Sequence, residues 1–332
     1  MARQAGVSRS TVSRVINDHP GVKEGVRARV LGVIQKTGYH PNAAARTLAS
    51  QRSRMIGLVL PRSVSSFFAD PYFPRLTQGI ATACNQYNYT LGLFLASTKE
   101  DEENIFPRVT RSGYLDGILL QSGQVGDTLM DRLIESKIPL VVAGRPPETK
   151  CVSYIDVDNV SAVYMAVNHL IRMGRQRIGT IAGPGDTTVG IDRKLGYLKA
   201  MSERSRPVDD LLVIEADFTE TGGYYAMRQM LAARPDAVFA ASDIMAIGAM
   251  RAIREAGLHI PDDIALVGFD DLPLATIPTP QLTTVRQPID QFGFQTVQIL
   301  IDLIENGINP PRRIIMDTEL IIRDSCGASR RW

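Results

Sequence analysis

From residue 55 onward, short apolar runs alternate with stretches of helical periodicity, and this alternation limits the chain to few folds. The apolar runs are Met55–Leu60, Thr90–Ala96, Gly117–Leu120, Leu140–Ala143, Arg177–Ala182, Leu211–Ala216, Ala237–Ala241 and Ile264–Phe269. The helical stretches are 74–88, 100–112, 126–136, 159–173, 189–204, 221–233, 244–256 and 289–305. Repeated strand–helix alternation predicts an α/β fold of parallel, doubly wound sheets. A stretch this long exceeds one compact core, so we expect two similar lobes.

Charge divides the chain at the same place. Residues 1–54 carry ten Lys or Arg and two acidic residues, a net charge of +8, whereas the remainder carries −6. A small basic head on an acidic body predicts a module that binds a polyanion, fused to a part with another task. A solvated basic tail is the alternative, and only the pattern inside the head distinguishes the two.

The head begins with a predicted short helix over residues 8–17, which Ser8 caps at its N-terminus. Val12, Val15 and Ile16 share one face at helical spacing. The basic and hydroxyl side chains that fall largely outside this face are Arg9, Ser10, Ser13 and Arg14. The helix therefore combines an apolar face for packing with a polar, positively charged face for a partner.

Two more helical segments surround this one. Residues 2–7 read as the end of an earlier helix, and a second full helix is expected from Lys23 to Lys36, stopped by Gly38 and Pro41. This is the layout of a helix-turn-helix, although a generic three-helix bundle would show similar spacing. In a major groove, Arg can read guanine, and Ser or Thr can contact bases or phosphates. The candidate DNA contacts on the short helix are Ser8, Arg9, Ser10, Thr11, Ser13 and Arg14.

Three motifs make the head familiar. AGVS at 5–8, TVSRVIN at 11–17 and GYHPNAAARTL at 38–48 resemble the headpiece of lac-repressor (LacI/GalR) family regulators. The resemblance implies a hinge helix around 42–50 that forms on operator DNA, with Leu48 wedged into the minor groove and kinking the duplex. It adds Asn17, Asn42 and Arg46 to the expected DNA contacts. An ordinary core leucine is the alternative for Leu48.

The start of the chain departs from the family pattern. Family members carry several more residues before the first helix, ending in a Val-Ala pair, and Met1-Ala2 falls on that pair. We therefore expect the first helix to be shortened to about its last turn. A start codon read at an internal valine codon would produce such a shortening.

The ends of the expected strands indicate a ligand site in the body, because ligands of such folds bind beyond the carboxyl ends of strands. Asp, Arg and aromatic residues gather there, in the segments 70–73, 144–147, 192–193, 242–243 and 270–271. Aromatic rings stack on apolar sugar faces, and carboxylate or guanidinium groups bind hydroxyls. This combination favours a polyhydroxylated ligand.

Body motifs also resemble the same family's effector-binding core. They are GRP at 144–146, AGP at 182–184, SDIMAIGAM at 242–250, VGFDD at 267–271 and LTTVRQP at 282–288. The resemblance implies that the effector cleft is lined by Tyr72, Phe73, Arg193, Ser242 and Asp270. Asp243 either touches the ligand or caps a helix. Arg145 either binds the ligand or closes the cleft mouth by a salt bridge. Asp156 and Asp158, near an expected lobe crossover, are interpreted as structural.

The resulting domain prediction has four parts. A DNA-binding headpiece occupies 1–40, and a hinge helix with its linker occupies 41–54. A periplasmic-binding-protein-like body follows, with an N-terminal lobe of 55–157 plus 287–316 and a C-terminal lobe of 158–286 plus 317–326. Because one headpiece reads a half-site, the chain is expected to act as a homodimer. Lobe movement about crossovers near 157, 287 and 316 would then control the hinge helices.

The sequence gives no support for nucleotide binding, metal binding or catalysis. Gly183, Gly185 and Gly190 miss the dinucleotide-binding spacing, and no phosphate-binding P-loop or serine-nucleophile motif occurs. The four His never pair at metal-ligand spacing, and the three Cys stand far apart. Asp270 and Asp271 are adjacent on an extended segment and point oppositely, which argues against acid–base work. We expect no cofactor, no metal and no enzymatic activity.

The leading prediction is a cytoplasmic, sequence-specific transcription regulator, most simply a repressor, that associates with the nucleoid when bound to DNA. Its partners would be double-stranded operator DNA, a second copy of itself and a small effector, with a sugar or sugar derivative favoured over a purine or other metabolite. A periplasmic-type solute receptor is the competing class, opposed by the basic head and by the lack of an apolar leader. No apolar run is long enough to span a membrane, so no membrane partner is expected.

Overall fold

The computed structural model describes residues 1–16, 19–38, 52–121, 123–148, 152–204, 208–307 and 310–328. The chain divides into two compact units, Met1–Arg54 and Met55–Trp332. We call the first the headpiece and the second the body, and each is considered by itself.

The described residues of the headpiece form three helices, α1 (Ala2–Ala5), α2 (Arg9–Ile16) and α3 (Glu24–Thr37). The Ser8 hydroxyl accepts a hydrogen bond of 3.1 Å from the Thr11 amide, as expected of the residue that caps α2. Gly38 ends α3 with a left-handed φ of 58°, a conformation that glycine adopts without strain. The predicted boundaries of α2 and α3 are therefore correct to within one residue or so.

The headpiece core is small. Its buried apolar residues among those described are Ala5, Val12, Val15 and Val30. They come from all three helices, so the periodicity of each helix is used to close one shared core. The predicted apolar face of α2 is confirmed for Val12 and Val15, whereas Ile16 is half-buried at its edge.

The body contains two six-stranded sheets. The first has the order β11 (Arg313–Met316), β5 (Ser153–Val157), β4 (Leu140–Ala143), β3 (Gly117–Gln121), β1 (Met55–Leu60) and β2 (Thr90–Leu95), with all neighbours parallel. The second has the order β12 (Glu319–Ile321), β10 (Thr283–Arg286), β9 (Ala265–Asp270), β8 (Ala237–Ala240), β6 (Ile178–Ala182) and β7 (Val213–Glu215). Among the described strands of this sheet, only β12 pairs antiparallel. The predicted two-lobed α/β class is confirmed.

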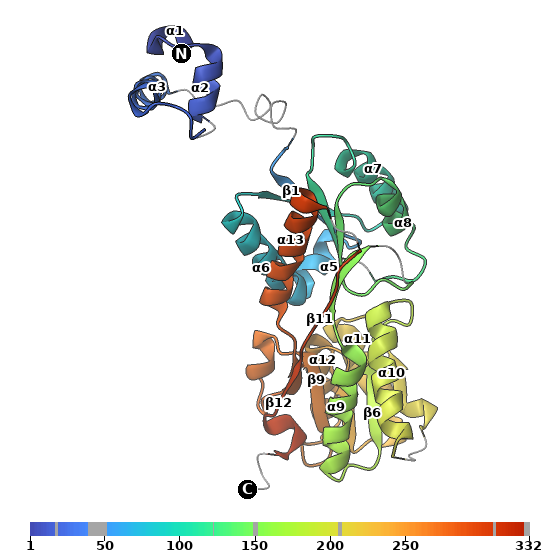
Figure 1. Cartoon of the computed structure of the whole chain (residues 1–332). Helices are drawn as coiled ribbons and strands as arrows, with labels where there is room; N and C mark the ends of the chain where they lie inside the picture. The colour runs from blue at the N-terminus through green and yellow to red at the C-terminus, as the bar shows by residue number, and fades with distance from the viewer. Residues whose placement is uncertain are drawn as a thin grey trace. The chain divides into compact units, whose positions relative to one another are not determined.

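Helices cover both sheets. Those of the first sheet are α5 (Val64–Ala69), α6 (Tyr72–Gln86), α7 (Lys99–Val109), α8 (Thr128–Glu135) and α13 (Ile289–Asn306). Those of the second are α9 (Asn159–Arg172), α10 (Thr188–Ser202), α11 (Glu220–Met230) and α12 (Asp243–Glu255), with short 3₁₀ turns at Asp210–Leu212, Leu231–Ala233, Pro273–Thr276 and Asp324–Cys326. Figure 1 shows α6 beside α13 in one half of the body, and α9 beside α10 in the other.

The chain passes between the two sheets three times. It leaves the first sheet after β5 and enters α9, returns after β10 into α13, and leaves again between β11 and β12. Because the strands are parallel, the polar segments that follow their carboxyl ends meet in the region between the sheets. The candidate ligand site lies there.

Candidate functional site

In the headpiece, helix α2 presents one polar face to solvent. Arg9, Ser10, Ser13 and Arg14 are exposed, as is the capping Ser8, while Thr11 is half-buried. The Ser8 hydroxyl hydrogen-bonds the hydroxyls of Ser10 at 2.7 Å and Thr11 at 2.8 Å, which fixes the start of the helix. The six side chains expected to contact DNA on this helix thus lie on its first turn and along its exposed face. Asn17, Asn42, Arg46 and Leu48 lie outside the described residues.

In the body, a cavity of about 290 Å³ lies between the two lobes, at the lower end of the range typical of small-molecule sites. The predicted residues that line it are Tyr72, Phe73, Arg193, Ser242 and Asp270. Tyr72 and Phe73 begin α6 of the first lobe, whereas the other three belong to the second lobe. Residues far apart in sequence therefore converge on one space. Arg145 and Asp243 are not among the lining residues.

Arg193, on the second turn of α10, is the buried cation of the cavity. Its side chain is only 6% exposed, and its guanidinium lies 3.6 Å from the centre of the Phe269 ring. Its Nε donates to Asn159 Oδ1 at 2.9 Å, and its Nη1 donates to the Ala241 carbonyl and lies 3.6 Å from Asp270 Oδ1. Burial lowers the Arg193 pKa, and the Asp270 carboxylate opposes that shift most strongly. Because arginine stays protonated in proteins, this position supplies a fixed positive charge.

Asp270 is the carboxylate partner of Arg193. It ends β9 with a φ of 117°, a region that residues other than glycine rarely adopt, and it is 5% exposed. Gln287, directly after β10, donates Nε2 to Asp270 Oδ1 at 2.6 Å. Burial raises the pKa of Asp270 above its usual range, and the Arg193 guanidinium opposes the rise. The pair joins the cavity to two of the three connections between the lobes, through Asn159 and Gln287.

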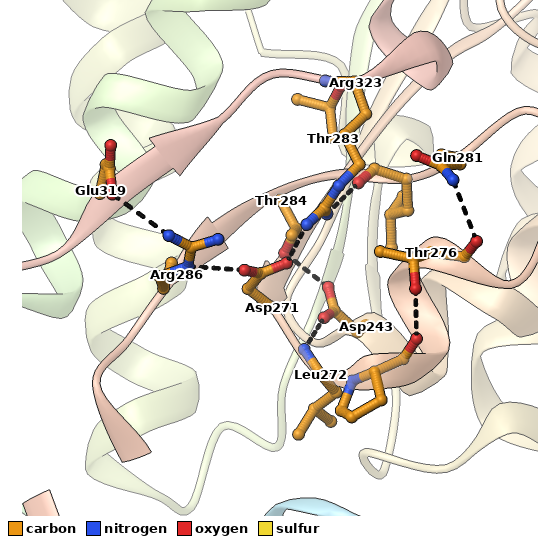
Figure 2. A network of polar contacts seen from close by, with 12 residues as sticks. Asp243, Asp271, Leu272, Thr276, Gln281, Thr283, Thr284, Arg286, Glu319 and Arg323 are labelled. Carbon is orange, nitrogen blue, oxygen red and sulfur yellow. Dashed lines mark hydrogen bonds and ion pairs between the residues drawn. The ribbon is translucent and has the colours of Figure 1, made fainter. Parts of the chain in front are cut away.

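Asp243 has a different environment from the one that ligand contact requires. It is fully buried at the start of α12, where it accepts hydrogen bonds from the Leu272 amide and the Thr284 hydroxyl (Figure 2). A Cβ on Gly268 would come within 2.5 Å of Asp243 Oδ1, so glycine makes room for this carboxyl. The structure thus places Asp243 as a link between the start of α12, the loop after β9 and strand β10, behind the cavity wall. Sequence reasoning missed this because the partners, Leu272 and Thr284, are distant in the chain.

The neighbouring Asp271 is also held by the protein itself. Its carboxylate receives Arg286 Nε at 2.7 Å and Arg323 Nη2 at 2.6 Å, as Figure 2 shows. The two adjacent carboxylates therefore have separate partners, in agreement with their expected opposite directions. This arrangement anchors the loop that begins directly after Asp270.

One rim of the cavity is closed by contacts between the lobes. Arg145, after β4, forms a bidentate ion pair with Asp192 of α10 at 2.8–3.1 Å. Beside it, the Thr188 hydroxyl donates to the Arg145 carbonyl at 2.9 Å, and the Thr188 amide donates to the Gly123 carbonyl at 2.8 Å. Of the two roles foreseen for Arg145, the structure displays the salt bridge at the mouth.

Several residues that line the cavity were not expected there from the sequence. Asp156, interpreted as structural, lines the cavity and also accepts hydrogen bonds from the amides of Arg145 at 2.9 Å and Val157 at 2.8 Å. Burial raises its pKa to about 6. Asp158 is indeed a helix cap, accepting from the Ser161 amide. Further lining residues absent from the expected site are Arg62, Asn159, Asp217 and Phe218, whereas Asp70 and Gln287 lie in segments singled out from the sequence, 70–73 and 282–288. Arg62, Asn159, Asp217 and Gln287 each lie within two residues of the end of a strand, which is the signal used before, but β5 and β10 were not located in the sequence.

Two further properties concern the described residues only. None of their helices is both long and apolar enough to cross a bilayer. Their His, Cys, Asp and Glu side chains form no group of three that could hold a metal ion.

Comparison with known proteins identifies the family. Residues 1–42 match the family described as bacterial regulatory proteins, lacI family, and residues 167–326 match the periplasmic binding protein-like domain. The HTH-type transcriptional regulator CelR of Thermobifida fusca is 37% identical over 335 residues, covering 98% of this chain and 96% of CelR. This chain belongs to the lacI family of bacterial regulatory proteins.

Other relatives of this lacI-family protein are regulators as well. Catabolite control protein A of Priestia megaterium is 33% identical, covering 90% of each chain. Among solved structures, a CelR–cellobiose complex matches with a TM-score of 0.79 and 35% identity, covering 98% of both chains. A lac repressor dimer bound to operator and an anti-inducer matches with a TM-score of 0.85 and 25% identity, covering 98% of this chain and 97% of that one. The expected family and its role in transcription regulation are confirmed.

Proposed function

We propose that this lacI-family regulator binds operator DNA as a homodimer through α2, and that a carbohydrate in the body cavity controls its affinity. The observation that carries the proposal is the buried Arg193–Asp270 pair, set among aromatic rings in a cavity between two lobes. Such a pair offers charged hydrogen-bonding groups to hydroxyls, and the rings offer apolar surface to a sugar ring.

The DNA half of the proposal rests on the exposed face of α2. Arg9 and Arg14 are five residues apart and exposed, as are the hydroxyl-bearing Ser10 and Ser13. A short helix of this kind fits a major groove, and a two-fold dimer would place two such helices on a palindromic site. The related lac repressor was solved as a dimer on its operator.

The effector half is supported by the relative CelR, which was solved with cellobiose. The cavity here holds rings from both lobes, Phe73 from the first and Phe218 from the second. Phe218 is held close to the backbone, since a Cβ on Gly183 would overlap its ring. A ligand ring between the lobes would therefore contact both, which links binding to lobe position.

The proposed mechanism couples these two sites. In it, the lobes comprise residues 55–157 plus 287–316 and 158–286 plus 317–326, and the ligand alters their relative position at the three connections. The hinge of residues 41–54 responds by forming or losing its helices on DNA. No catalytic step belongs to this mechanism, and we place the protein with its DNA in the cytoplasm.

The proposal is tested with the full chain and DNA selected by it from a random library. We expect a palindromic consensus, and a loss of affinity of at least about tenfold between 50 and 200 mM salt as phosphate contacts are screened. Adding cellobiose or another neutral sugar should shift the operator affinity, and the direction of the shift distinguishes inducer from corepressor. A selection that yields no consensus would contradict sequence-specific binding.

A purine is the second candidate effector, favoured by the same aromatic rings, because Tyr72 and Phe218 could stack on a base. Adenine and guanine therefore belong in the same assay. If a purine shifts the operator affinity and no sugar does, the effector is a purine, and the proposed role as a regulator still holds.

A further inference from the structure

The cavity has an unequal balance of charge. Its lining carries four carboxylates and two guanidinium groups, from Asp70, Asp156, Asp217 and Asp270 and from Arg62 and Arg193. Both lobes contribute to the excess, since Asp70 and Asp156 come from the first and Asp217 and Asp270 from the second. A ligand in this space meets more negative than positive charge.

The two guanidinium groups do not offset this excess for a ligand. Arg193 already donates to Asn159 and Ala241 and faces Asp270, so the protein uses much of its hydrogen-bonding capacity. The Arg62 guanidinium lies 4.2 Å from the centre of the Phe73 ring. Its positive charge also attracts the Asp70 carboxylate. Each cation thus has a carboxylate neighbour inside the cavity.

The carboxylates retain capacity to accept hydrogen bonds. Asp70 Oδ1 accepts from the Tyr72 amide at 3.0 Å, and Asp217 Oδ1 accepts from the Thr219 amide at 3.1 Å and the Thr219 hydroxyl at 2.6 Å. Within the described residues, the second oxygen of each receives no hydrogen bond. An ionised carboxylate only accepts, so its partner must donate. A hydroxyl group on the ligand can donate such a hydrogen bond. A phosphate or carboxylate on the ligand cannot, because when ionised its oxygens only accept hydrogen bonds, as the protein's carboxylates do.

We propose that the cavity selects an uncharged polyhydroxylated ligand and rejects its phosphorylated or acidic derivatives, with Asp70 and Asp217 as the specificity-determining residues. This inference rests on the proposed carbohydrate effector and narrows its class. An anion transferred from water into this space loses hydration and meets like charge at short range, and both effects oppose binding.

The test compares matched pairs on the full chain by thermal shift and calorimetry. Cellobiose, maltose and glucose are each paired with their 6-phosphate and their uronic or aldonic acid. We expect at least one neutral sugar to bind, with its charged partners weaker by tenfold or more. Any charged member that binds as tightly as its neutral partner overturns the inference but leaves an effector-controlled regulator. A panel in which nothing binds overturns both this inference and the carbohydrate effector, while operator selection still tests DNA binding.

Variants assign the selectivity to the named residues. Asp70→Asn and Asp217→Asn keep the side-chain size and should narrow the neutral-to-charged ratio at least threefold each. The control is Asp210→Asn, an exposed aspartate on a 3₁₀ turn outside the cavity, which should leave the ratio unchanged. Melting temperatures show whether each variant is folded. Folded Asp70 and Asp217 variants with wild-type ratios would remove these residues from the selectivity.

Discussion

The headpiece and the body differ in where they place the side chains expected to bind a partner or ligand. The headpiece closes a core of small and branched side chains, Ala5 and three valines, and exposes its candidate recognition groups on α2. The body closes three large cores that include aromatic side chains, and it buries its candidate recognition groups, Arg193 and Asp270. An exposed face can meet a partner as large as a duplex, whereas a buried pair requires the protein to surround its ligand. The difference predicts unequal responses to the same kind of mutation.

The largest effect is expected from Arg193→Met in the body. Removing one partner of a buried pair leaves Asp270 uncompensated, which costs about 3–5 kcal/mol of unfolding free energy. The effector response should be lost while a folded variant still binds operator. Denaturant unfolding and DNA binding with and without ligand measure both results.

The matched control is Arg145→Met, which breaks an ion pair at the cavity rim. Arg145 is 35% exposed, and solvent weakens such pairs, so the loss should stay below about 1 kcal/mol. Equal losses for the two variants would contradict the distinction between buried pair and rim pair. A normal effector response in Arg193→Met would remove this residue from the ligand site.

The next effect is expected in the headpiece, from Arg14→Ala. If Arg14 reads a base, operator binding weakens by about 1–3 kcal/mol. Body stability should be unchanged because the side chain is exposed on a separate unit. Fluorescence anisotropy on operator and on random DNA distinguishes the roles, since an equal loss on both identifies a phosphate contact.

A somewhat smaller loss is expected from Val30→Ala in the headpiece core. Val30 is fully buried, and removing two methyl groups costs about 1–2 kcal/mol. A unit this small has little stability to spare, so the variant should lose operator binding by unfolding the headpiece. Limited proteolysis should then cut the headpiece faster while the body remains intact, and unchanged proteolysis would show that the small core is more stable than its size suggests.

The last prediction is a dependence of body stability on pH. Burial raises the pKa of Asp156 to about 6, whereas the unfolded residue titrates near 4. Between these values the folded chain binds more protons, so stability falls as pH rises from about 4 to 6. Asp270 and Asp243, whose pKa values burial also raises, act in the same direction.

Melting temperatures of wild type and Asp156→Asn across pH 4.5 to 7 measure this contribution. The variant should show a shallower decline, and Asp210→Asn should keep the wild-type slope. A slope that persists in full without Asp156 would assign the effect to other groups.

The sequence predicted most of the fold because long periodic segments carry strong signals. The bounds of β1 and β4 were predicted to the residue, since each is a continuous apolar run. It missed β5, β10, β11 and β12, which are three to five residues long and include polar positions such as Ser153 and Thr283. It also missed α5, six residues in which a single side chain is buried.

The candidate site was predicted less completely for a related reason. Tyr72, Phe73, Arg193, Ser242 and Asp270 were expected in one cleft, and the structure brings them together. The direction of a side chain at a strand end depends on partners distant in sequence, so the burial of Asp243 could not be seen. The part played by Asp156 was hidden because its strand was not recognised.

The rim beside Arg145 joins the two lobes through several contacts at once. The Arg145–Asp192 pair and the hydrogen bonds of Thr188 involve neighbouring residues, so the geometry that breaks one strains the others. When several contacts must break together, a partly opened cleft has already lost them and has formed no new ones in return. Intermediate degrees of opening are therefore unfavourable. We therefore expect the cleft to occupy a few discrete positions instead of a continuum. A sensor with discrete positions responds to rising ligand by changing how many molecules have switched, and each single molecule remains either on or off.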